Sequence, residues 1–73
     1  MPELIDPDIF EDLKIAVDNK NIDSIVDNFN KLGYNRHDLK HNLNRQNQGS
    51  QLAEYCNLIL FVIQKNKSKA KTD

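Results

Sequence analysis

The chain contains few of the residues on which catalytic and disulfide-stabilised proteins depend. It has one cysteine, Cys56, two glycines and no tryptophan among its 73 residues. A single cysteine excludes an internal disulfide framework and favours a reducing compartment. Two glycines are too few for a glycine-rich phosphate loop. So short a chain buries only roughly 60% of the surface that its unfolded form exposes, so we expect one small domain with no catalytic pocket and no cofactor.

Long apolar segments are also missing. The longest run, residues 58–63, has six apolar residues, whereas a membrane-spanning helix needs about 20. The first residues, Met1-Pro2-Glu3, lack the cationic start and apolar core of a signal peptide. We therefore expect an intracellular protein, cytoplasmic or nuclear, with no membrane contact.

Charge is balanced overall but unevenly distributed. The net charge is −1, yet residues 1–30 carry eight acids and two bases, whereas residues 31–73 carry eight bases and three acids. Folded together, the halves would attract each other, although exposed ion pairs contribute only about 0–1 kcal/mol each. The basic half could instead meet an anionic partner. Solvated faces and a loose tail are the simpler interpretation.

Residues 1–20 are predicted to form an acidic amphipathic helix. Asp6 is a natural N-cap and Pro7 fits the first helical position. The polar residues 18–21 end the helix. Its apolar residues recur at three- and four-residue spacing; they are Ile9, Phe10, Leu13, Ala16 and Val17.

Two further helices are predicted on either side of Gly33, where a left-handed C-terminal cap belongs. The first starts near Asn21. Asn35 and Asp38 resemble a capping box that starts the second, with Tyr34 and Leu39 as its hydrophobic staple. Residues 44–50 are loop-like. The apolar stripe of the earlier helix comprises Ile22, Ile25, Val26, Phe29 and Leu32.

The last helix is predicted from about Ser50 to Lys65, followed by a basic disordered tail over residues 66–73. A buried strand over residues 58–63 is the alternative. One stripe of this helix comprises Leu52, Cys56, Ile59, Leu60 and Ile63, and Leu58, Phe61 and Val62 face elsewhere. We expect the N-terminal helix to cover this second apolar face, and a dimer could bury it otherwise.

Candidate reactive groups are better explained by structural roles. His37 and His41 have the spacing of metal ligands on a helix, but no third ligand stands in a fixed relation to them. Cys56 lies within an apolar stripe, which is typical of a buried cysteine that acts as a small hydrophobe. The sequence therefore predicts no metal site and no catalytic residue.

The basic helix over residues 35–46 could alternatively act as the reading helix of a helix-turn-helix protein. Arg36, Lys40 and Arg45 suit contacts to phosphates and base edges. However, the acidic first half of the chain would repel the duplex, and Phe29 is bulky where helices must cross closely. Nucleic-acid binding is the alternative interpretation.

The spacing of Leu32-Gly33-Tyr34, Leu39, Leu43 and Ala53 resembles the ubiquitin-associated (UBA) domain family. That family is a three-helix bundle whose first connection is a Met/Leu-Gly-Phe/Tyr loop. The resemblance covers about residues 21–63. Within the family, this stretch is most similar to the variant found in AMP-activated-kinase-related protein kinases. It implies an all-α fold with a UBA-like core over residues 21–65 and an additional N-terminal helix.

The resemblance also implies a non-catalytic protein-interaction module that binds ubiquitin or a dedicated partner such as a kinase domain, as a regulatory element. The expected binding surface combines the loop with the last helix. Many ubiquitin-binding members carry a Leu-Leu pair where this chain has Cys56-Asn57, which weakens the expectation for ubiquitin. The implied partner-binding residues are Leu32, Gly33, Tyr34, Cys56, Asn57 and Leu60.

Overall fold

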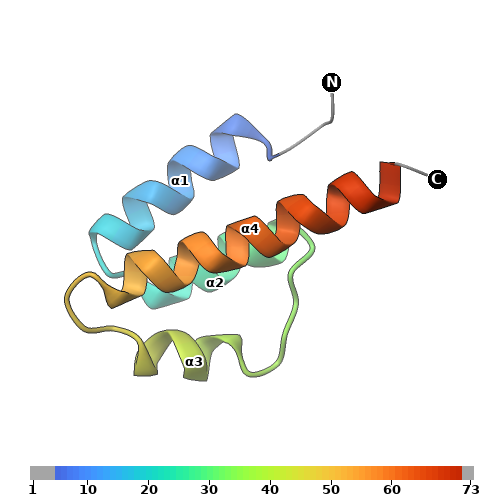
Figure 1. Ribbon diagram of the computed structural model, residues 1–73. Coiled ribbons are helices and arrows are strands. Elements are labelled where there is room, and N and C mark those ends of the chain that lie inside the picture. Colours follow the sequence, from blue (N-terminus) through green and yellow to red (C-terminus); the bar gives the residue numbers. More distant parts are fainter. Residues whose placement is uncertain (1–4, 72–73) are drawn as a thin grey trace.

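Over the described residues, the backbone is helical apart from short connections (Figure 1). The structure, a computed structural model, describes residues 5–71 and the side chains of residues 5–67. No strand occurs within residues 5–71, so the all-α prediction is confirmed and the strand alternative for residues 58–63 was wrong. Residues 5–71 form four helices: α1 (Pro7–Asp18), α2 (Ile22–Lys31), α3 (Leu39–Arg45) and α4 (Gln51–Lys71).

The first two helices begin where their capping residues predict. Asp6 accepts a hydrogen bond from the backbone N–H of Asp8 at 2.9 Å, and Pro7 occupies the first helical position. Asn21 caps α2 by accepting from the backbone N–H of Ser24 at 3.3 Å. Each cap pairs a backbone donor that the helix itself leaves without a partner.

Both helices end in the same hydrogen-bonded motif. After α2, Gly33 has φ +88°, and Tyr34 donates its backbone N–H to the carbonyl of Phe29 at 3.0 Å. After α1, Lys20 takes the corresponding left-handed position with φ +55°, and Asn21 donates to the carbonyl of Ala16 at 2.9 Å. Glycine is the usual residue here because a Cβ atom is strained at positive φ. The glycine was predicted and the lysine was not.

The third helix starts later than the capping box indicates. It begins at Leu39, and Asp38 occupies the N-cap position without a side-chain hydrogen bond to the backbone. Leu39 donates its N–H to the carbonyl of Arg36 at 3.1 Å, so a turn precedes the helix. The predicted capping box at Asn35 was therefore wrong. The short helix buries Leu39 and Leu43 almost completely.

The fourth helix continues past its predicted end. Its backbone is helical to Lys71, whereas the sequence patterning indicated an end at Lys65 and no ordered structure beyond it. The added segment contains no glycine or proline, and its lysines and alanine are good helix formers. A helix can thus extend beyond the residues that pack on the core. The last two residues of the predicted tail, 72 and 73, lie outside the described residues.

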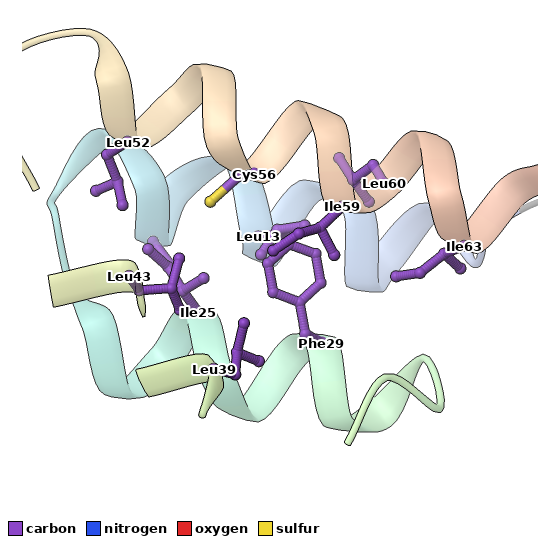
Figure 2. Packing of buried hydrophobic residues seen from close by; sticks show 11 residues of the cluster. Leu13, Ile25, Phe29, Leu39, Leu43, Leu52, Cys56, Ile59, Leu60 and Ile63 are labelled. Atoms are coloured by element: carbon purple, nitrogen blue, oxygen red, sulfur yellow. The ribbon is translucent and has the colours of Figure 1, made fainter. Parts of the chain in front are cut away.

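A single hydrophobic core joins all four helices (Figure 2). In Figure 1, α1 lies along one side of α4 and α3 lies below α2. Phe29 of α2 is fully buried and points toward Leu13 of α1 and Ile59 of α4. The predicted inner stripe of α4 is confirmed as its buried face. The remaining core residues are Ala16, Ile25, Leu39, Leu43, Leu52, Cys56, Leu60 and Ile63.

The N-terminal helix packs on a different face of α4 from the one expected. Leu13 and Val17 of α1 line a groove with Cys56 and Leu60 of α4. The buried arc of α4 is wide enough to contact α1 on one side and the other helices elsewhere, so α1 completes the same core. The expected packing on the outer apolar residues was wrong, because Leu58, Phe61 and Val62 stay exposed.

Candidate interaction surfaces

The six residues predicted to bind a partner divide into two groups in the structure. Leu32, Gly33 and Tyr34 follow α2, and they lie beside the later turns of α4. Cys56, Asn57 and Leu60 lie earlier in α4, beneath and beside α1. The structure therefore does not bring the six residues into one continuous surface.

The first group lines an open hollow, which we call the loop hollow. Its volume is about 220 Å³. Tyr34 is held in place by the ring of Phe29, whose centroid lies 6.0 Å from its own with the ring planes tilted at 59°. Leu32 and Tyr34 are half-buried and rest against the core, so the hollow has a firm apolar floor. Its lining residues are Leu32, Gly33, Tyr34, Ile63, Asn66 and Lys67.

The second group lies at the α1–α4 groove. Cys56 is 2% exposed and Leu60 is 9% exposed, whereas Asn57 faces solvent. The groove holds about 160 Å³ between Phe10 and Lys14 of α1 and the α4 residues. Burial raises the pKa of the Cys56 thiol from its ordinary 9.0 to about 11. The thiol is thus protonated at neutral pH, which does not suit a nucleophile.

A polar cluster that the sequence did not predict lies beside the loop hollow. Asp38, Asn42 and Tyr55 line one hollow together with Arg36 and Tyr34. Burial acts most strongly and raises the pKa of Asp38, but the positive charge of Arg36 and the polar side chain of Asn42, with smaller effects, together leave that pKa lowered. The Arg36 Nε atom lies 3.5 Å from the Asp38 carboxylate, an ion-pair distance. The pKa of Tyr55 is raised, mainly because the phenol is partly buried.

An apolar surface lies on the outer face of α4, opposite the core. Leu58 is 64% exposed, Phe61 is 61% exposed and Val62 is 44% exposed. We call these three residues the α4 stripe. The Lys65 ammonium lies 5.8 Å from the centroid of the Phe61 ring, within cation–π range. The sequence predicted this second apolar face, but it also predicted that the N-terminal helix would cover it.

The residues considered for metal or nucleic-acid binding do not form a surface comparable to the loop hollow or the α4 stripe. His37 lies in the turn before α3 and His41 lies within the helix, both exposed. Among the described residues, no three histidine, cysteine or acidic side chains gather closely enough to hold a metal ion. Lys40 forms an ion pair with Asp23 of α2 at 3.0 Å.

None of the helices in the described part of the chain has the length and apolar character needed to cross a membrane.

Comparisons of the chain with protein-family models, with curated proteins and with solved structures find no match. Function is therefore inferred from the surfaces described above: the loop hollow, whose apolar side chains are half-buried or buried, and the α4 stripe, whose apolar side chains are exposed.

Proposed function

We propose that this chain is a non-catalytic protein-interaction module that uses the loop hollow as a binding surface. The observation that carries the proposal is the position of Leu32, Gly33 and Tyr34 against the later turns of α4, where they line a mainly apolar hollow open to solvent. A rigid apolar floor with a polar edge is typical of small protein-binding sites. The protonated, buried thiol of Cys56 favours a structural role for that residue.

The resemblance to UBA domains supports ubiquitin, or a dedicated partner such as a kinase domain, as the ligand. In the UBA domains that this chain resembles, the loop and the last helix form one surface. In this chain the helix would contribute Ile63, Asn66 and Lys67 to that surface in place of Cys56 and Leu60, because α1 covers the latter two. The proposed site therefore has a positive charge at its edge and fits a partner surface with an apolar centre beside an acidic residue.

DNA binding is less well supported. Two of the three basic side chains considered for it have acidic neighbours, Arg36 with Asp38 and Lys40 with Asp23. Their positive charge toward a phosphate backbone is correspondingly reduced, although exposed pairs of this kind are weak.

A two-dimensional NMR titration of isotope-labelled protein with unlabelled ubiquitin tests the proposal. We expect chemical-shift changes confined to residues 32–34 and 63–67. Lys67→Glu should weaken the interaction, whereas Lys14→Glu, the same charge change at the α1–α4 groove, should leave it unchanged. An absence of shifts would exclude ubiquitin and leave the dedicated partner.

A parallel titration with a short DNA duplex covers the other function. In this titration no protein ligand is present. DNA-induced shifts on α3 that disappear as salt is raised, through release of counterions, would contradict the proposal. An apolar site should be nearly insensitive to salt by comparison.

A further inference from the structure

The α4 stripe is bounded by one charged residue at each end. Glu54 precedes it and Lys65 follows it, and both side chains are exposed. Glu54, Leu58, Phe61 and Lys65 are separated by four, three and four residues, so they share one face of the helix. This face lies opposite the buried stripe and is covered by no other part of the described chain.

The spacing of these four residues is the same in both directions. Two copies of α4 that cross antiparallel about a twofold axis between Leu58 and Phe61 therefore align fully. Leu58 of each copy lies opposite Phe61 of the other, and Glu54 of each lies opposite Lys65 of the other. A parallel pairing would instead oppose Glu54 with Glu54 and Lys65 with Lys65, which is repulsive.

We propose that the α4 stripe is a self-association surface on which a second copy of this chain docks through an antiparallel α4–α4 contact. The residues that bound the stripe, Glu54 and Lys65, carry opposite charges. This is the complementarity that a twofold antiparallel contact requires.

The surface beside the stripe also fits the opposing side chain. Leu58 and Tyr55 line an open hollow of about 350 Å³ together with Gln46, Gln51 and Glu54. In the antiparallel alignment, Phe61 of the second copy lies opposite Leu58 and can enter this hollow. Without the second copy, Lys65 covers one face of the Phe61 ring. Docking would transfer that ammonium to Glu54 of the other chain.

Sedimentation equilibrium of the full chain tests the proposal. A contact through one helix face per chain lies at the small end of protein interfaces, so the protein concentration should span roughly 5 to 500 µM. We expect the average mass to rise from that of one chain toward that of two. Phe61→Ser should weaken dimerisation about tenfold or more, whereas Ile15→Ser, at an exposed apolar residue of α1, should not change it.

Charge exchange tests the antiparallel alignment. Glu54→Lys or Lys65→Glu alone should weaken dimerisation about tenfold, because each variant creates two repulsive pairs. The double variant E54K/K65E should dimerise within about threefold of the original chain. In a parallel contact the double variant would gain nothing over the original, and the single variants would not be selectively weak. Circular dichroism on each variant confirms that the exposed substitutions leave the helices intact.

Three results would overturn the proposal: a single-chain mass at every concentration, a dimer unaffected by Phe61→Ser, and a double variant as weak as the single ones. The first would leave the stripe to a different protein or to a lipid surface. None of them bears on the loop hollow, whose titration with ubiquitin is read at residues 32–34 and 63–67.

Discussion

Replacing Phe29 by alanine should remove about half of the stability of the fold. Phe29 is 0% exposed and its ring contacts the core between α1 and α4 as well as the ring of Tyr34. Truncating a buried phenylalanine to alanine costs about 3–5 kcal/mol. A 73-residue chain has a free energy of unfolding of about 4–11 kcal/mol at the usual value per residue. At the centre of these ranges, the variant should therefore keep only about 3–4 kcal/mol of stability.

Urea unfolding followed by circular dichroism at low micromolar concentration measures this loss. With a denaturant slope of about 1 kcal/mol per molar urea, the midpoint should fall by about 3–5 M. Phe61→Ala provides the matched control, because Phe61 is 61% exposed in the single chain and its truncation should cost about 1 kcal/mol or less. Equal, small losses for both variants would refute the assignment of Phe29 to the core centre.

Three further predictions concern caps and ionisation. Asp6→Ala should cost about 1 kcal/mol by removing the hydrogen bond to the N–H of Asp8, measured as a lower melting temperature. Lys20→Gly should gain about 0.5–1 kcal/mol by relieving its positive φ, whereas Gly33→Ala should lose about as much without any clash; urea midpoints that move the other way would contradict this. Stability should fall as pH rises from 9 toward 11, since Cys56 ionises at about 9.0 in the unfolded chain and at about 11 in the folded one. The fall should be smaller in Cys56→Ala, where only the contribution of Tyr55, whose pKa is also raised by burial, remains of these two groups.

Local signals in the sequence were sufficient to predict most helix ends. Asp6 with Pro7, Asn21 and Gly33 each determine a boundary through hydrogen bonds or φ angles that involve only neighbouring residues. The stripe that contains Leu52 and Ile63 was also predictable, because a helical repeat of apolar residues directly identifies a buried face.

Packing between distant segments could not be predicted in the same way. Helix α4 has two apolar faces, and no local signal tells which of them α1 contacts; this depends on how α2 and α3 share the core. The start of α3 at Leu39 was likewise not predicted by the capping preference of Asn35, because a turn precedes the helix in the structure. Packing between distant segments also separates the predicted binding residues, because α1 covers Cys56 and Leu60.

The position of α1 on α4 both separates the predicted binding residues and leaves the α4 stripe uncovered. Nuclear Overhauser contacts of the Leu13 methyl groups in the full, labelled chain test it most directly. We expect cross-peaks from Leu13 to Phe29, Ile59 and Leu60. Cross-peaks from Leu13 to Leu58 and Phe61, with none to Ile59, would contradict it.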